Sequence, residues 1–106
     1  MTAFSERIYD LLRKVPKGSV TTYRELAHGV NTRAYRAVGQ AMKNNPYAPS
    51  VPCHRVVASS GHIGGFSGEI TGKAIQNKIN MLKIEGIEFE GNKIKNFNEV
   101  LYRFGC

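Results

Sequence analysis

The chain has 106 residues, the size of one small domain, and 42% of them are hydrophobic. Its 15 Lys and Arg residues outnumber eight Asp and Glu residues, which gives a formal net charge of +7. Such a surplus favours a polyanionic partner. Two cysteines are too few for a disulfide framework, and the sequence shows neither a signal peptide nor an apolar run of membrane-spanning length. We therefore expect an intracellular protein, cytoplasmic or nuclear, with no membrane partner.

The first predicted helix lies near the start of the chain. Apolar residues recur there at the spacing of one helix face, and Thr2 is a plausible N-cap: Phe4, Ile8, Leu11 and Leu12. The segment from Val15 to Gly18 contains Pro and Gly and predicts the turn that ends this helix.

Two further helices are predicted between residues 22 and 43. Thr22-x-x-Glu25 is a capping box that opens a short helix, which breaks at residues 28–31. A second helix is predicted from Asn31 or Thr32 to Lys43. This outline is that of a helix-turn-helix, which many small helical domains share without binding DNA. The positive charge is concentrated here, since residues 1–45 carry eight basic and three acidic side chains, and this favours nucleic acid.

The second of these helices is rich in small residues, namely Ala37, Gly39 and Ala41. Arg36, which precedes them, would be the single long side chain with which this helix reaches into a nucleic acid. A helix that reads the major groove usually presents base-reading side chains, so this slim helix would instead approach a backbone or a narrow groove. Alternatively, the small residues allow close helix packing and Arg36 is only solvated. Periodicity alone does not choose between these readings.

The second half of the chain mixes strand and helix signals. Val56-Val57 predicts a buried strand, and residues 63–68 predict a loop whose one aromatic, Phe66, would stack on a planar ligand. Ile75, Ile79 and Leu82 define a helix that ends at residues 85–86 with Gly86 as its C′ residue. Residues 87–94 predict a hairpin around the Gly-Asn pair at 91–92, and residues 97–104 predict a last short helix.

The main candidate for chemistry is Cys53, which follows Pro52 and precedes His54. A thiolate next to a titratable histidine is a candidate nucleophile. The alternative is a structural cysteine, because free cysteines are often buried. Neighbours on a strand point to opposite faces, so Cys53 and His54 would need a turn or a bridging water to cooperate. A zinc site is excluded because four ligands at suitable spacing are not present.

Several short motifs occur together and in one order. They are Thr22-Tyr23, Arg36-Ala37-Val38-Gly39-x-Ala41-Met42, Asn45-Pro46, Pro52-Cys53-His54-Arg55-Val56-Val57, Ser59-Ser60-Gly61, Gly64-x-Phe66-Ser67-Gly68 and Glu85-Gly86. With these motifs, residues 4–97 resemble the C-terminal, active-site domain of the O6-alkylguanine-DNA alkyltransferases, also called methylated-DNA–protein-cysteine methyltransferases.

The resemblance implies a fold and a partner. The fold would be α+β and mostly helical, a winged helix-turn-helix-like DNA-binding domain with a short β-hairpin. Residues 1–106 would form a single domain without the N-terminal domain that is usual in the family. The partner would be double-stranded DNA containing alkylated guanine, bound through its minor groove by a monomer. No cofactor and no metal are implied.

The resemblance also implies DNA repair by a protein that acts once. Cys53 would take the alkyl group from O6-alkylguanine irreversibly, making the chain a single-turnover methyltransferase. His54 would deprotonate Cys53 through a water, and Glu85 would orient His54. Asn45 would brace the turn that carries the site, and Tyr23 would help to rotate the nucleotide and donate a proton to the leaving guanine.

The remaining site residues would contact DNA or the flipped base. Arg36 would fill the gap in the base stack, and the DNA-binding set would also include Thr22, Tyr23, Ala37 and Gly39. The alkylguanine pocket would be formed by Gly64, Val56, Phe66 and Ser67.

Two other functions remain open from the sequence. A non-catalytic alkyltransferase-like protein would bind O6-alkylguanine and flag it for nucleotide excision repair, but such proteins typically replace the cysteine that is present here as Cys53. A helix-turn-helix protein with a structural Cys53 would instead prefer particular sequences in undamaged DNA.

Overall fold

The computed structural model describes residues 3–47, 50–64 and 72–104. Its helices are α1 (Ala3–Leu12), α2 (Tyr23–Gly29), α3 (Tyr35–Lys43), α4 (Lys73–Ile84) and α5 (Phe97–Val100). Strand β1 (Thr21–Thr22) pairs in parallel with β2 (Val56–Val57), and β3 (Phe89–Glu90) pairs antiparallel with β4 (Lys93–Ile94). The fold is α+β and mostly helical, which confirms the predicted class. No helix in the described ranges is long and apolar enough to cross a bilayer.

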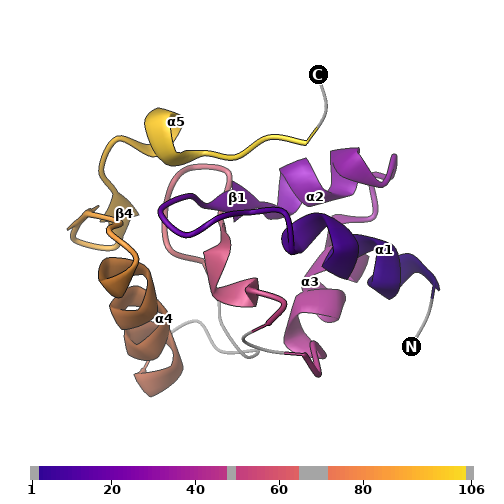
Figure 1. Cartoon of the computed structure of the whole chain (residues 1–106), viewed down its shortest axis with the longest axis horizontal. Coiled ribbons are helices and arrows are strands. Elements are labelled where there is room, and N and C mark those ends of the chain that lie inside the picture. Colours follow the sequence, from indigo (N-terminus) through magenta and orange to yellow (C-terminus); the bar gives the residue numbers. More distant parts are fainter. Residues whose placement is uncertain (1–2, 48–49, 65–71, 105–106) are drawn as a thin grey trace.

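Helices α1, α2 and α3 pack around one hydrophobic core (Figure 1). The amphipathic pattern of α1 buries Ile8 and Leu12, as predicted, and also Tyr9. The Tyr9 hydroxyl donates a hydrogen bond of 2.8 Å to the carbonyl of Ala41, which ties α1 to α3. This core holds α2 and α3 in the predicted helix-turn-helix arrangement.

The start of α2 confirms the capping prediction, whereas the start of α3 does not match the sequence. The Thr22 hydroxyl accepts a hydrogen bond of 3.0 Å from the Glu25 amide. Helix α3 begins at Tyr35 and not at Asn31 or Thr32. Asn31 adopts a left-handed conformation, with φ of 59°, which ends helical geometry at that residue.

A polar turn then delays α3. The Thr32 hydroxyl accepts a hydrogen bond of 3.1 Å from the Ala34 amide, so the chain is held in a side-chain turn until the helix starts. The predicted start was therefore three to four residues too early.

Strand β2 joins the two hydrophobic cores. Val56 packs into the core of α1–α3, and Val57 packs into a second core with α4, because successive strand residues point to opposite faces. In Figure 1, α4 and helices α1–α3 lie on opposite sides of β1 and β2. The turn that carries Cys53 immediately precedes β2 and so lies where the two halves meet.

The end of α4 is fixed by a Schellman motif. Gly86 is left-handed, with φ of 96°, and its amide donates to the Lys83 carbonyl at 3.0 Å. The amide of Ile87 donates to the Leu82 carbonyl, also at 3.0 Å. Gly86 is therefore the C′ residue, as predicted, and Glu85 is the C-cap. The Glu-Gly pair thus sets the position of the Glu85 side chain.

The C-terminal segment contains the predicted hairpin and a shorter helix than the predicted range. Residues 91–92 connect β3 to β4. Helix α5 ends at Val100 because Leu101 is extended and pairs with Val20. Two hydrogen bonds hold this pairing, from the Val20 amide to the Val100 carbonyl (2.9 Å) and from the Tyr102 amide to the Val20 carbonyl (2.7 Å).

Candidate active site

The backbone at Cys53 is held by two consecutive tight turns. Pro52, with φ of −81° and ψ of 71°, forms an inverse γ-turn in which the Cys53 amide donates to the Val51 carbonyl at 2.8 Å. Cys53, His54 and Arg55 then form a 3-10 turn, so they do not alternate as strand neighbours do. Cys53 is a free cysteine and is partly exposed. The thiol therefore combines a rigid backbone with access to a ligand.

His54 is buried and pairs with Glu85. Its Nε2 lies 2.9 Å from Oε2 of Glu85, which projects from the C-cap of α4. Glu85 thereby engages one ring nitrogen and leaves Nδ1 for a different partner. The structure brings together the two residues that the sequence resemblance had paired.

Arg55 completes this arrangement and was not predicted as a site residue. Its Nε and one terminal nitrogen donate to the two oxygens of Glu85, at 2.8 and 2.7 Å. The other terminal nitrogen donates to the carbonyl of Val15 at 2.8 Å. Arg55 therefore connects the Cys53 turn, the end of α4 and the segment that follows α1.

The environment of Glu85 keeps its carboxyl ionised. Burial alone would raise the pKa of Glu85, but hydrogen bonds from Arg55 and His54 and their positive charges lower it below its usual value. The bidentate guanidinium contact is the strongest type of pairing for a carboxylate. Glu85 thus remains an acceptor for His54 instead of becoming protonated itself.

Lys78 is a second buried cation near the thiol, and the sequence reasoning missed it. Its side chain is fully buried, and Nζ donates to the carbonyl of Ile63 at 2.6 Å. Burial lowers the pKa of Lys78 to about 7, while the charge of a Cys53 thiolate acts in the opposite direction. Lys78 lies three residues after Ile75 and four before Leu82, so the helical pattern itself placed this lysine on the buried face.

Replacing Lys78 by methionine should remove a pH dependence of stability. The folded-state pKa of about 7 lies below the unfolded value of 10.5, so the unfolded chain binds more protons between these values. Stability of the wild type should therefore rise with pH from about 7 to 10. Urea unfolding across this range should show the rise in the wild type and in Lys83→Met, an exposed control on α4, but not in Lys78→Met. A flat wild-type profile would contradict the assignment.

Tyr23 and Gly64 line the same region. Burial raises the pKa of Tyr23, and the charge of Cys53 raises it further, so the phenol remains a proton donor. Gly64 has φ of 73°, and a Cβ there would lie 3.8 Å from both Tyr23 Cε2 and Lys78 Nζ. Glycine at this position therefore permits the left-handed backbone and the close approach of the Ala58 amide nitrogen, which would lie 3.3 Å from such a Cβ.

Asn45 braces the loop that leads to Cys53. Its Nδ2 donates to the carbonyl of Val51 at 2.9 Å, and its Oδ1 accepts from the amide of Tyr47 at 2.9 Å. Asn45 thus links the backbone of Tyr47 to that of Val51, just before the Pro52 turn.

The outer face of α3 is exposed and slim. Arg36 and Ala37 are exposed, whereas Val38 and Met42 are buried against the core. A Cβ at Gly39 would meet nothing within 4 Å in the described part of the chain. Among the described residues, internal helix packing therefore does not explain the small residues at 37 and 39, and this face is open to another molecule.

The predicted site residues fall into separate groups. Tyr23, His54, Glu85 and Gly64 gather around the Cys53 turn with Val56, which is buried in β2. Thr22 is also buried, and its hydroxyl is occupied by the cap of α2. Phe66 and Ser67 lie outside the described residues. Within the described ranges, no three His, Cys, Asp or Glu side chains are placed to hold a metal ion.

Comparison with known proteins gives consistent matches. The family model described as "6-O-methylguanine DNA methyltransferase, DNA binding domain" matches residues 3–87. A methylated-DNA–protein-cysteine methyltransferase of Thermococcus kodakarensis is 48% identical over 89 residues, which cover 83% of this chain and 47% of that protein. The chain thus spans about half the length of the curated relatives it matches. The match to a DNA-binding domain does not by itself identify the family's C-terminal active-site domain.

Solved structures agree with this match. The O6-methylguanine-DNA methyltransferase of Pyrococcus kodakaraensis KOD1 has a TM-score of 0.70 at 48% identity, and the alignment covers 82% of this chain and 48% of that one. Atl1 of S. pombe, in complex with damaged DNA containing O6-carboxymethylguanine, has a TM-score of 0.80 at 33% identity and covers 97% of both chains. On its sequence and on its fold, the chain belongs to the 6-O-methylguanine DNA methyltransferase family.

Proposed function

We propose that this chain repairs O6-alkylguanine in DNA by transferring the alkyl group to Cys53. The observation that carries the proposal is the partly exposed thiol on a rigid turn, followed directly by a buried His54–Glu85 pair. The Cys53 sulfur attacks the alkyl carbon, the carbon–oxygen bond breaks, and the electron pair leaves with the guanine oxygen. The thioether that forms has no leaving group to regenerate the thiol, so each molecule acts once.

The proton donors and acceptors of the site fit this reaction. His54 takes the Cys53 proton through a water, and Glu85 stabilises the resulting imidazolium. Arg55 keeps Glu85 ionised, and the charge of a Cys53 thiolate favours the ammonium form of the buried Lys78. Tyr23, whose pKa is raised by burial, supplies a proton to the departing guanine. His54, Lys78 and Tyr23 thus act on charge that develops when Cys53 is deprotonated or reacts, whereas Arg55 holds Glu85 ionised beforehand.

Access to a guanine inside a duplex requires that the base leave the stack. The slim outer face of α3 would lie in the minor groove, with Arg36 filling the vacated space. Tyr23 would displace the target nucleotide, and Gly64, Val56, Phe66 and Ser67 would hold the flipped base. The S. pombe protein that covers the whole fold was solved with damaged DNA, which supports this partner. We propose that the protein carries out the reaction as a monomer.

Binding without transfer is the second candidate function, because the S. pombe neighbour, solved in complex with damaged DNA, matches over 97% of both chains. The nucleophile and its buried partners favour transfer, since a lesion sensor needs no paired histidine behind a thiol. The two functions differ in stoichiometry, which an experiment can count.

The test is a titration of a duplex containing one O6-methylguanine with limiting amounts of protein. We expect the number of repaired lesions to rise linearly with protein and to stop at one per molecule. A stable complex with no repaired lesion would assign the chain to the sensor class. Repair well above one lesion per molecule would contradict the irreversible thioether.

Glu85→Gln should slow transfer and leave DNA affinity unchanged. A glutamine offers one acceptor oxygen, so it cannot hold both Arg55 and His54 in the observed arrangement. Loss of the orienting carboxylate should reduce the transfer rate roughly 100-fold, the lower range for general acid–base assistance. Single-turnover kinetics gives the rate, and anisotropy with undamaged duplex serves as the control for folding. An unchanged rate would show that Glu85 has no role in activating Cys53.

A further inference from the structure

A polar groove lies between the turn that follows β2 and the C-terminal segment. Its volume is about 920 Å³, and its walls come from residues 59–60 on one side and from residues in the range 90–99 on the other. The family match ends at residue 87, so one wall lies beyond the matched region. None of the proposed catalytic residues lines this groove.

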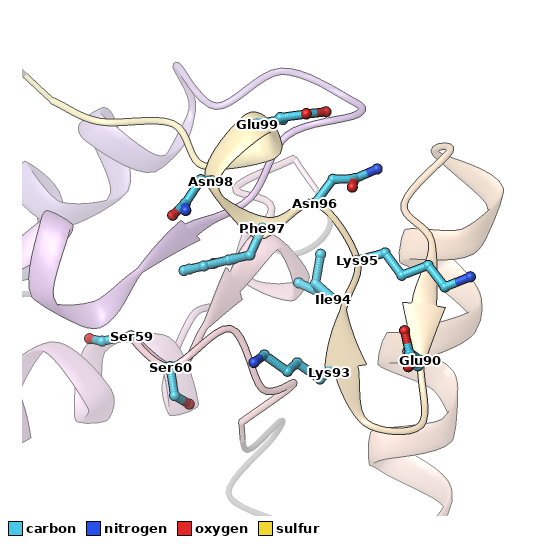
Figure 2. Close-up of a pocket in the computed structure, with 10 residues that line it drawn as sticks. All are labelled: Ser59, Ser60, Glu90, Lys93, Ile94, Lys95, Asn96, Phe97, Asn98 and Glu99. Atoms are coloured by element: carbon cyan, nitrogen blue, oxygen red, sulfur yellow. The ribbon is translucent and has the colours of Figure 1, made fainter.

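The side chains in the groove divide by direction, as Figure 2 shows. The Lys93 side chain and the Phe97 ring extend to the side of the groove on which Ser59 and Ser60 lie, and Asn98 turns to the same side above them. The side chains of Lys95, Asn96 and Glu99 point away from that gathering. This side of the groove therefore presents an ammonium group, an amide and an aromatic ring next to two serines, and Glu90 lines the groove as well.

These groups are held in place before any ligand binds. Lys93 forms a backbone bridge with His62, and the His62 ring is hydrogen-bonded to the Ser60 hydroxyl at 2.8 Å. The Phe97 ring packs on Gly61, where a Cβ would lie only 3.1 Å from Phe97 Cγ. In the described part of the chain no carboxylate lies within salt-bridge distance of Lys93. Glu90, the cross-strand partner of Lys93 on β3, also lines the groove but forms no ion pair with it in the described structure, so the Lys93 ammonium remains open to a ligand.

A second hollow of about 410 Å³ continues the groove toward α2. The two share Ser59, Phe97 and Asn98, and the second adds Arg24 and Arg103. Glu25 also lines this end, so the two arginines outnumber one carboxylate.

The groove and the second hollow together extend from Lys93 to the first turn of α2, which also carries Tyr23. Cations stand at both ends, with hydroxyl and amide donors between them. This spacing of donors fits a chain of anions better than a single ion.

We propose that this groove binds the phosphodiester backbone of the DNA that flanks the target nucleotide. The inference rests on the proposed function, because it extends the same DNA beyond the helix-turn-helix. Phosphate contacts from lysine, arginine and hydroxyl groups fix the register of a protein on a duplex without reading its sequence. The groove would set how Tyr23 and Cys53 meet the lesion.

Lys93→Ala tests the groove, and Lys95→Ala is the matched control, since it removes an identical charge that points away. Affinity for an undamaged duplex is measured by fluorescence anisotropy at several salt concentrations. Removal of one lysine–phosphate ion pair should lower the slope of log K against log salt by about one. We expect Lys93→Ala to show this decrease and a severalfold weaker affinity at low salt, with Lys95→Ala close to the wild type.

Transfer from free O6-benzylguanine to each variant separates this inference from the proposed function. It should be equal in all three proteins, because neither lysine is among the residues around Cys53 and the free base needs no contact with a DNA backbone. If Lys93→Ala binds DNA as the wild type does, or if both variants lose the same affinity, the groove is not a phosphate-binding site. The proposed alkyl transfer would be unaffected by either result. A wild type that transfers nothing and binds no DNA would overturn both proposals.

Discussion

Cys53→Ser should abolish alkyl transfer completely while the protein still folds and still binds damaged duplex. The serine side chain is close in size, and position 53 is only partly buried, so the turn should persist. A serine hydroxyl stays protonated near neutral pH, whereas a thiolate is the species that attacks. Counting the O6-methylguanine that remains in the duplex after a long incubation should show no loss with this variant.

Cys106→Ser is the matched control, since it removes the other cysteine of the chain. It should repair one lesion per molecule, as the wild type does. Residual transfer by Cys53→Ser that disappears in the double variant would show that Cys106 is an acceptor and that the site is wrongly assigned. Loss of damaged-duplex binding in Cys53→Ser would show that the thiol serves the fold.

Arg36→Ala should separate base extrusion from alkyl transfer. Arg36 is exposed on the outer face of α3, outside the buried cluster around Cys53. Without a side chain to fill the vacated stack, extrusion costs more, so transfer from duplex DNA should slow roughly tenfold or more. Transfer from free O6-benzylguanine, which needs no extrusion, should remain within about twofold of the wild type.

Arg33→Ala controls for the loss of charge, because Arg33 is an exposed arginine in the turn before α3. It should weaken duplex binding through lost electrostatic attraction but show a smaller effect on transfer at saturating DNA. Equal rate losses in the two variants, or equal losses by Arg36→Ala on duplex and free base, would rule out the finger role.

Local signals explain what the sequence predicted correctly. The capping hydroxyl of Thr22, the left-handed Gly86 and the Gly-Asn pair at 91–92 each act over a few residues, so their effects can be read from neighbours alone. The Pro52-Cys53 corner is similarly local. The candidate nucleophile could therefore be found without knowledge of the fold.

Other features depend on contacts between distant segments. The β1–β2 pair joins residues 35 apart, Thr21 with Val56 and Thr22 with Val57, in strands of two residues each. So short a parallel pair leaves no periodic pattern in a sequence. The pairing of Val20 with Leu101, which ends α5, is equally non-local.

The roles of Arg55 and Lys78 escaped sequence reasoning for a related reason. A basic side chain is usually solvated, and only the fold shows that Arg55 spans Glu85 and Val15 and that Lys78 is buried beside the site. Burying such charges costs stability unless they are paired. Their concentration behind a single thiol is typical of a site in which charge, and not stability, has determined the residues.

The most direct test is intact-protein mass spectrometry after incubation with a duplex containing one O6-methylguanine, followed by peptide mapping. The predicted result is a mass increase of one methyl group in every molecule, located on Cys53. A protein of unchanged mass that nevertheless forms a stable complex with the damaged duplex would contradict the transfer reaction. A methyl group on any other residue would contradict the assigned site.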